Sequence, residues 1–175
     1  MAESSAALAS PRALTWGAAL LAVVMIAPLL WILGLSLKAN DALMLGIEAV
    51  KPGNTFGDIG YAIQSYVESH RMSVVRDFCG HGLGRVFHAP PNVLHYGRPG
   101  SGPVLEEGMF FTIEPMVNLG RPATKVLAAE WTAVTRDKSL SAQFEHSVGV
   151  TADGVDIFTL SPAGTFHPTY TQTAE

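Results

Sequence analysis

The sequence has a single cysteine, Cys79, and few charged residues, which make up 15% of its 175 residues. One cysteine excludes an intrachain disulfide and is consistent with a reducing compartment. The formal net charge is −4, and no run of lysine or arginine is present. Nucleic acid is therefore not expected as a partner, and the acidic balance is interpreted as an ordinary solvated surface.

Charge is absent altogether from residues 13–37, an apolar run between Arg12 and Lys38. A helix of about 25 residues, at roughly 1.5 Å per residue, exceeds the roughly 30 Å of bilayer hydrocarbon. The run therefore predicts one transmembrane helix, and one basic residue on each side leaves its orientation open. A cleavable signal peptide is the alternative, but its apolar region is shorter, about 7–15 residues, and no small-residue cleavage site is evident here.

Two further helices are predicted downstream of the apolar run. The first covers residues 41–50 and ends at Pro52-Gly53. The second begins after Thr55, which is suited to cap it, and Asp58 favours its positive end. Its predicted inner face consists of Ile59, Ile63, Tyr66, Val67 and His70.

Later in the chain the pattern alternates with the period of a β-strand. Strands are predicted over residues 109–117, 131–135, 142–150 and 155–160, with turns at 136–138 and 152–154. In the first strand, Thr112 and Glu114 share the polar face. Together with the two helices, these strands make an α+β unit.

Glu114 and Glu145 each lie on the polar face of a predicted strand. If the two strands are neighbours, the carboxylates share one pocket, and a divalent cation would relieve their mutual repulsion. The alternative is that this face of the sheet is simply solvated.

Two histidines strengthen the metal interpretation. His81 lies between two glycines, which let the backbone approach a site, and His88 follows seven positions later. Imidazole and carboxylate together suit a divalent ion, while a structural histidine is the alternative. Cys79 is interpreted as a small wall residue, because no base is assigned to it. His70 and His95 are interpreted as packing or surface residues.

Several segments together resemble the C-terminal half of type I methionine aminopeptidase, a pita-bread metallopeptidase. They follow the family's order across residues 41–160: KPG at 51–53, SVVR at 73–76, CGHGLGR at 79–85, FH at 87–88, GMFFTIEPMV at 108–117 and SLSAQFEH at 139–146. The resemblance implies a partial, half pita-bread fold with a curved antiparallel sheet and two helices. It also implies a metal-dependent aminopeptidase that removes N-terminal methionine from nascent proteins.

The resemblance further implies roles for individual residues. His81, Glu114 and Glu145 would bind divalent metal ions (Co, Mn, Fe or Zn), of which the family holds two, with Glu145 bridging them. Glu114 would also handle the proton of the nucleophilic water, and His88 would contact the substrate carbonyl. The other implied positions are the methionine pocket (Cys79, Phe87 and Trp131) and a monovalent-cation site (Ser141).

The family builds its site from two halves, and the two aspartates and the additional histidine of the first half have no counterpart here. Upstream of Pro52 the carboxylates are Glu3, Asp41 and Glu48. The isolated chain is therefore expected to hold at most one ion and to have weak or no activity. Expected partners are a nascent-protein N-terminus and a chain that supplies the missing half. The alternative is a non-catalytic module that binds peptides or a partner.

Residues 28–38 resemble the opening span of a carbohydrate ABC-transporter permease. The expected organisation is a disordered N-terminus (1–12), a transmembrane helix (13–37), a methionine aminopeptidase-like domain (41–160) and a loose tail (161–175). The domain is expected in the cytoplasm, tethered by a single-pass helix, or wholly cytoplasmic if the N-terminal segment is an artefact. A fusion in which the enzyme-like part is a passenger is a further alternative.

Overall fold

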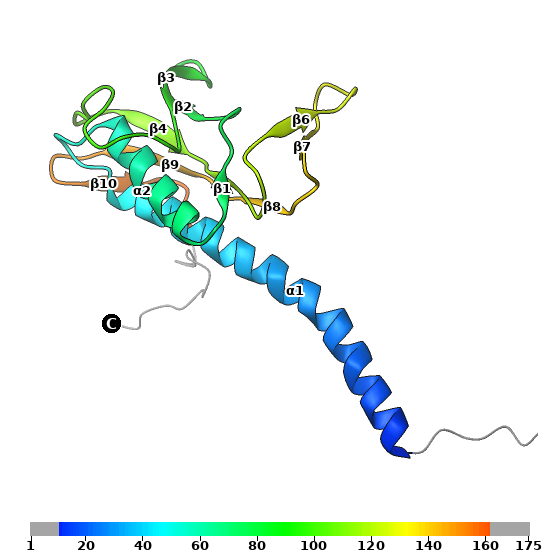
Figure 1. Cartoon of the computed structure of the whole chain (residues 1–175). Helices are drawn as coiled ribbons and strands as arrows, with labels where there is room; N and C mark the ends of the chain where they lie inside the picture. The colour runs from blue at the N-terminus through cyan, green and yellow to red at the C-terminus, as the bar shows by residue number, and fades with distance from the viewer. Residues whose placement is uncertain (1–10, 162–175) are drawn as a thin grey trace, which may run out of the picture. The chain divides into compact units, whose positions relative to one another are not determined.

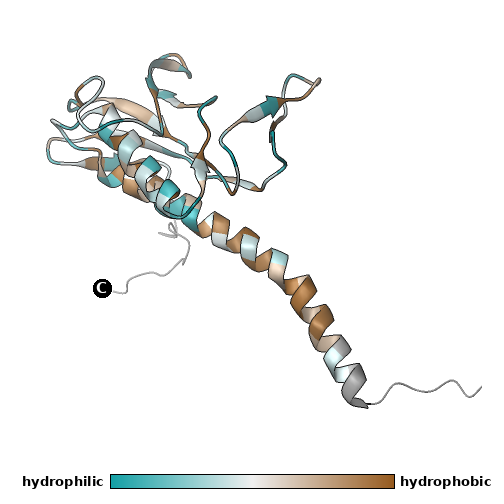
Figure 2. Cartoon of the chain, in the orientation of Figure 1, coloured by the Kyte–Doolittle hydropathy of each residue, from teal (hydrophilic) through white to brown (hydrophobic). Residues whose placement is uncertain are grey.

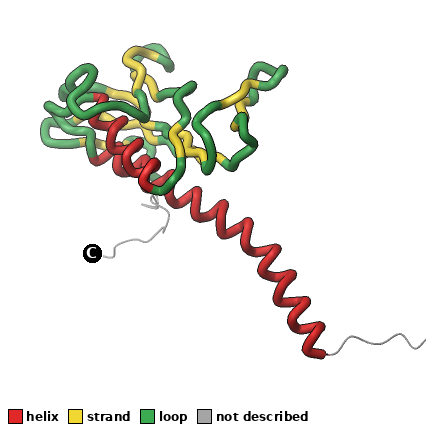
Figure 3. The backbone as a smooth tube through the Cα atoms, in the orientation of Figure 1, coloured by secondary structure: helices red, strands yellow, loops and turns green. Residues whose placement is uncertain are grey.

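The computed structural model describes residues 11–161, so most of the predicted disordered N-terminus and loose tail lies outside the described residues. Within residues 11–161 the chain forms two helices and ten strands (Figures 1 and 3). Every strand pairing in this part of the chain is antiparallel. This confirms the predicted α+β fold class with antiparallel sheets, and one of the two helices, α1, is the apolar N-terminal helix.

Helix α1 runs without interruption over Pro11–Glu48, so the prediction of a separate helix at 41–50 is wrong. Residues 37–41 contain neither glycine nor proline, and nothing in that stretch breaks the helical backbone. Pro28 also lies inside the helix. The chain divides into two compact units within α1, the first ending at Gly34 and the second beginning at Leu35.

The described part of the first unit is an apolar stretch of helix with exposed side chains. Trp16 is 76% exposed, Leu29 is 62% exposed and Trp31 is 71% exposed. Figure 2 shows brown, hydrophobic residues dominating this part of α1. By length and composition the segment Ala18–Glu48 could cross a membrane, although a signal sequence or a core helix passes the same test.

Helix α2 (Phe56–Ser69) begins as predicted, with Thr55 as its N-cap. The Asp58 carboxylate accepts hydrogen bonds from the Thr55 backbone N–H at 2.7 Å and from the Thr55 hydroxyl at 2.8 Å. These bonds hold the pKa of Asp58 below its usual value. The buried residues of the helix are Phe56, Ile59, Gly60, Ile63 and Val67.

The strands form three sheets. The five-stranded sheet has the spatial order β10 (Val155–Ile157), β9 (His146–Val150), β4 (Phe110–Ile113), β2 (Gly80–Gly82) and β3 (Ala89–Val93). The three-stranded sheet has the order β1 (Ser73–Val74), β5 (Met116–Asn118) and β8 (Ser141–Gln143). The last sheet is the hairpin of β6 (Thr124–Val126) and β7 (Ala133–Thr135).

Each of the two long predicted strands divides into two shorter ones, which belong to different sheets. β4 pairs with β9 as far as Ile113 opposite His146, whereas β5 pairs with β8 from Met116 opposite Gln143. The residues between these two ladders are Glu114, Pro115, Phe144 and Glu145, and we call them the strand break. The strands are therefore neighbours, as the shared-pocket interpretation required, and both candidate carboxylates lie at the strand break.

One apolar cluster holds the second unit together. It joins the last turns of α1, helix α2 and the central strands, with Leu43, Ile63 and Phe111 fully buried. Phe56 meets Phe111 edge to face, with ring centroids 5.0 Å apart. The helices thereby support the central strand β4, which leads directly into Glu114.

Candidate metal centre

Strand β2 presents His81, whose side chain is 12% exposed. Its pairing with β3 shifts register between His81 and Gly82, an irregularity that turns side chains locally. A Cβ at Gly80 would collide with the backbone carbonyl oxygen of Thr112 in β4. Only glycine therefore lets β2 approach β4 this closely, and this approach brings His81 to Glu114.

The hydrogen bonds of His81 fix which ring nitrogen faces the carboxylate. Nδ1 lies 3.1 Å from the carbonyl oxygen of Gly82, which can only accept, so Nδ1 carries the proton. Nε2 then presents its lone pair, 3.8 Å from Oε1 of Glu114. In the neutral form of the His81 ring, an imidazole lone pair and a carboxylate oxygen therefore face each other, the arrangement of ligands that share a cation.

Thr112 connects the two candidate ligands. Its hydroxyl accepts the His81 backbone N–H at 3.0 Å and donates to Oε1 of Glu114 at 2.7 Å. Thr112 is 1% exposed. The alternating pattern of β4 predicted that Thr112 and Glu114 share one face of the strand. That pattern could have indicated this contact, but no role was predicted for Thr112.

Glu114 is half-buried and held from several sides. Gln143 Nε2 donates to its backbone carbonyl at 3.3 Å and to Oε2 at 3.4 Å. Burial raises the pKa of Glu114, and the charge of Glu145 raises it further, against the opposing hydrogen bond from Thr112. A bound cation would relieve both effects.

His95, expected to be a packing or surface residue, contacts Glu114 directly. Its Nε2 accepts the Glu114 backbone N–H at 3.0 Å, and the residue is 2% exposed. Burial lowers the pKa of His95 to about 4, so the ring is neutral near pH 7. An isolated histidine in the sequence gave no signal of this contact.

Other predicted residues surround the pair. The His81 ring lies edge to face with the His88 ring, with centroids 4.4 Å apart, and 5.4 Å from the Phe87 ring. Glu145 is exposed at the strand break. Burial, followed by the charge of Glu114, raises the pKa of the Cys79 thiol, which is the opposite of what an activated nucleophile needs.

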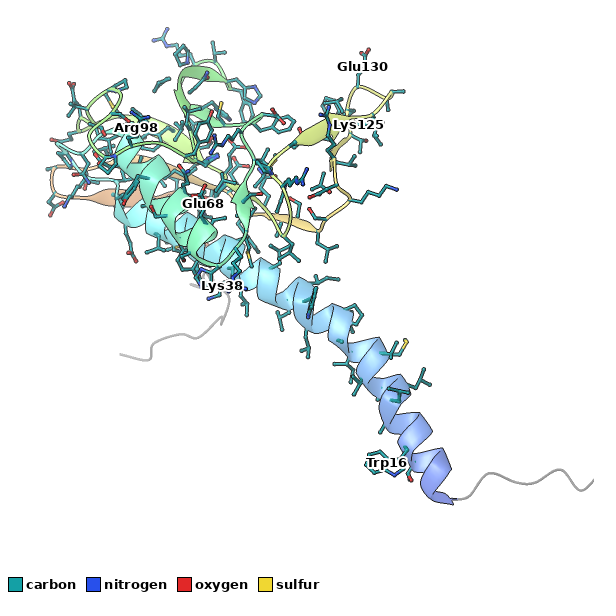
Figure 4. The ribbon with its side chains drawn as sticks, in the orientation of Figure 1. Trp16, Lys38, Glu68, Arg98, Lys125 and Glu130 are labelled. Carbon is teal, nitrogen blue, oxygen red and sulfur yellow. The ribbon has the colours of Figure 1, made fainter. Side chains whose placement is uncertain are left out.

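The remaining two predicted residues lie on other elements. Trp131 is 93% exposed, in the turn between β6 and β7. Figure 4 labels its neighbour Glu130 at the tip of that hairpin. Ser141 begins β8 and lines a cavity of about 520 Å³ beside the hairpin.

The structure brings together two of the three predicted metal ligands. Within residues 11–161, no three His, Cys, Asp or Glu side chains are close enough to hold a metal ion together. His81 and Glu114 face each other, whereas Glu145 affects Glu114 through its charge from the exposed side of the strand break. The paired imidazole and carboxylate fit a divalent ion as a partial ligand set.

These features define a partial pita-bread fold around a candidate metal centre. Residues 37–152 match the model of metallopeptidase family M24. The match covers more than half of the chain, which therefore belongs to metallopeptidase family M24. Divalent metal ions are implied by that family. Residues 1–36 lie outside the match, and the resemblance of residues 28–38 to a permease span stays a prediction.

Curated relatives agree with this family. The chain is 62% identical over 131 residues to a methionine aminopeptidase of Rickettsia prowazekii, covering 74% of this chain and 51% of that protein. It is 57% identical over 121 residues to methionine aminopeptidase A of Synechocystis, covering 69% and 48%. The chain thus spans about half the length of the curated relatives it matches.

Solved structures show the same partial correspondence. The crystal structure of methionine aminopeptidase from Rickettsia prowazekii matches with a TM-score of 0.74 and 59% identity, covering 75% of this chain and 53% of that one. Methionine aminopeptidase from Thermotoga maritima matches with a TM-score of 0.71 and 43% identity, covering 72% and 51%. A prolidase from Pyrococcus furiosus, 23% identical with a TM-score of 0.53, shares the fold alone.

Proposed function

We propose that this chain carries part of the active site of a metal-dependent aminopeptidase that removes N-terminal methionine. The observation that supports this most directly is the pairing of His81 Nε2 with Glu114 Oε1, two acceptors 3.8 Å apart. Relatives at 62% and 57% identity are named methionine aminopeptidases. The substrate class, the N-terminus of a nascent protein, follows from those names and from the motifs in the sequence.

His81 and Glu114 would hold the ion, which would be Co, Mn, Fe or Zn, and the resemblance to the family adds Glu145 as a third ligand. This chain alone is expected to hold one ion, and Glu145 would bridge to a second if further ligands were supplied. A bound divalent metal lowers the pKa of its water and polarises the scissile carbonyl.

The chain's own residues would do the rest. Glu114, whose carboxylate lies beside the proposed ion, would take and return the proton of the attacking water. His88, beside His81, would donate to the substrate carbonyl. The remaining roles are the wall of the methionine pocket (Cys79, Phe87 and Trp131) and a monovalent-cation site (Ser141).

Calorimetric titration with Mn²⁺ tests the metal centre. We expect one ion to bind the wild-type chain and binding to be lost in His81→Ala and Glu114→Gln. His70→Ala, which changes the exposed C-cap histidine of α2, is the matched control and should bind normally. Binding that persists without His81 would contradict the proposal. Hydrolysis of a Met-Ala-Ser peptide by the isolated chain should be weak or absent, and rapid hydrolysis that Glu114→Ala abolishes would overturn that expectation.

A second candidate function is partner binding. The chain would act as a half-domain that binds a partner, whether or not the chain is catalytic. The cavity of about 520 Å³ is lined by Met116 of β5, Val134 of β7 and Leu140. Within the described residues, Asn118 Oδ1 and Ser139 Oγ in its lining are buried without a hydrogen-bond partner. Buried polar atoms of this kind normally have partners. The occupant we propose is the part of an M24 domain that this chain does not span, supplied by another chain.

Co-expression tests this partner. A tagged fragment of the Rickettsia prowazekii enzyme, the portion that this chain does not match, should co-purify with the chain in the presence of a chelator. Leu140→Asp should weaken capture because it places a charge in the cavity wall. Leu127→Asp is the matched control, a leucine of similar exposure outside the cavity lining. If the wild-type chain does not capture the fragment, or if Leu140→Asp and Leu127→Asp capture it equally, this surface is not the binding site.

The exposed apolar part of α1 is proposed to anchor the chain in a membrane as a single span, with the M24 unit in the cytoplasm. Trp16, Leu29 and Trp31 are each more than half exposed to solvent, which water disfavours and lipid does not.

A further inference from the structure

His95 is the most buried histidine beside the candidate metal centre, and the proposed function gives it no role. It is 2% exposed, and it follows β3 by two residues. Its ring nitrogen Nε2 lies 3.0 Å from the backbone nitrogen of Glu114. A histidine that only filled space would not need to aim a ring nitrogen at this atom.

The chemistry of this contact fixes the state of the ring. A backbone N–H can only donate, so Nε2 accepts and the proton of the neutral ring is on Nδ1. This tautomer is the same as that of His81, whose Nδ1 donates to the Gly82 carbonyl. The two imidazoles thus act on Glu114 differently: His81 faces its carboxylate, and His95 accepts a hydrogen bond from its backbone.

The strand break explains why Glu114 needs such an acceptor. β4 ends at Ile113 and β5 begins at Met116, so the Glu114 N–H lies between two ladders. Pro115, the next residue, has no N–H at all. A buried N–H without an acceptor is strongly disfavoured, so an alternative path for the strand would otherwise be preferred.

We propose that His95 is a positioning residue, which fixes the backbone of Glu114 so that Thr112 and His81 meet its carboxylate in one rotamer. The inference rests on the proposed function for its consequence, metal binding, but not for the contact itself. Glu114 is then held at four places: its N–H by His95, its Oε1 by Thr112 at 2.7 Å, and its carbonyl and Oε2 by Gln143 at 3.3 Å and 3.4 Å.

The contact is tested first in the wild-type chain, by NMR on ¹⁵N-labelled protein. We expect a scalar coupling across the hydrogen bond between the Glu114 amide nitrogen and His95 Nε2, and a slowly exchanging Glu114 amide. Absence of the coupling together with a rapidly exchanging amide would overturn the proposal without any variant having to fold.

The consequence is tested with a pair of variants, His95→Gln and His95→Phe. Glutamine can place an acceptor near the position of Nε2, whereas phenylalanine fills the space without one. We expect Mn²⁺ affinity to fall about 10–100-fold in His95→Phe, as for other partners that orient metal ligands, and to recover in His95→Gln. Equal affinities in wild type and His95→Phe would reject the positioning role. If the wild type binds no Mn²⁺, the metal proposal fails, while the NMR result still decides the contact.

Discussion

Thr112 uses both hydrogen-bonding capacities of one hydroxyl, one for each candidate ligand. Thr112→Val keeps the shape but removes the acceptor of the His81 N–H and the donor to Glu114 Oε1. Because both groups are part-buried, we expect the free energy of unfolding to fall by about 1–3 kcal/mol. Urea-induced unfolding of the chain in detergent measures this free energy. Thr112→Ser, which keeps the hydroxyl, should recover most of the lost stability.

Gly80 permits the close approach of β2 to β4. In Gly80→Ala the added methyl group meets the rigid backbone carbonyl of Thr112, so we expect a loss of about 1–3 kcal/mol in unfolding free energy. Gly84→Ala is the matched control, since a Cβ there meets nothing within 4 Å. Equal unfolding midpoints for both variants would show that β2 can move away without penalty.

At the residue scale, the sequence predicted much of the candidate site but not the residues that form hydrogen bonds to its candidate ligands. The motif around His81 and the alternation around Glu114 were sufficient to propose the pair, which the structure places face to face. Phe144, at the strand break, is 37% exposed. Period-two alternation does not continue across the strand break, and which strands pair on either side is a long-range property.

Among the elements, the α2 cap provides a pH-dependent test. The Thr55 N–H and hydroxyl hold the pKa of Asp58 below its usual value of 3.8. A depressed pKa stabilises the fold above the unfolded pKa, and this contribution is lost as pH falls through the folded one. Asp58→Asn should therefore lower unfolding free energy by about 1 kcal/mol at pH 7.

The difference between wild type and Asp58→Asn should narrow as the pH falls below the usual carboxyl pKa of 3.8 and through the lower pKa of the folded state. Unfolding curves from pH 7 to pH 3 measure this. Asp156→Asn, on the exposed side of β10, is the control and should change stability at pH 7 by less than about 0.5 kcal/mol. A difference that stays constant with pH would mean that the carboxylate charge of Asp58 does not matter.

A polar contact joins the last turns of α1 to α2. The Tyr66 hydroxyl donates to Asp41 at 2.7 Å and accepts from Lys38 at 3.0 Å (Figure 4 labels Lys38). Tyr66→Phe should lower the unfolding free energy by about 1 kcal/mol in urea titrations. Tyr61→Phe, on the same helix and 48% exposed, should change it little.

The continuity of α1 illustrates why element boundaries were hard to predict. The hydropathy change near Lys38 marked a change of environment, and it was interpreted as a change of element. Leu35, Ala39 and Leu43 are buried in the second unit although they continue the helix of the first. A helix can continue while the surroundings of its side chains change, so composition alone does not locate the end of a helix.

For the molecule as a whole, the membrane proposal is tested by a charge in the apolar helix. Leu29→Arg should release the chain from membranes under alkaline wash, because an arginine at the centre of a span is disfavoured by about 2.5–3.5 kcal/mol. Leu29→Ile should remain in the membrane fraction. A wild-type chain that is itself released by the wash would reject the anchor.

The strand break also bears on how chain length can vary within the family. An inserted or deleted residue between Ile113 and Met116 would leave the register of β4 with β9, and of β5 with β8, unchanged. The same change would displace the carboxylate of Glu114 from His81. A change of spacing in this segment is therefore expected to affect the metal centre more than the pairing of the strands on either side of it.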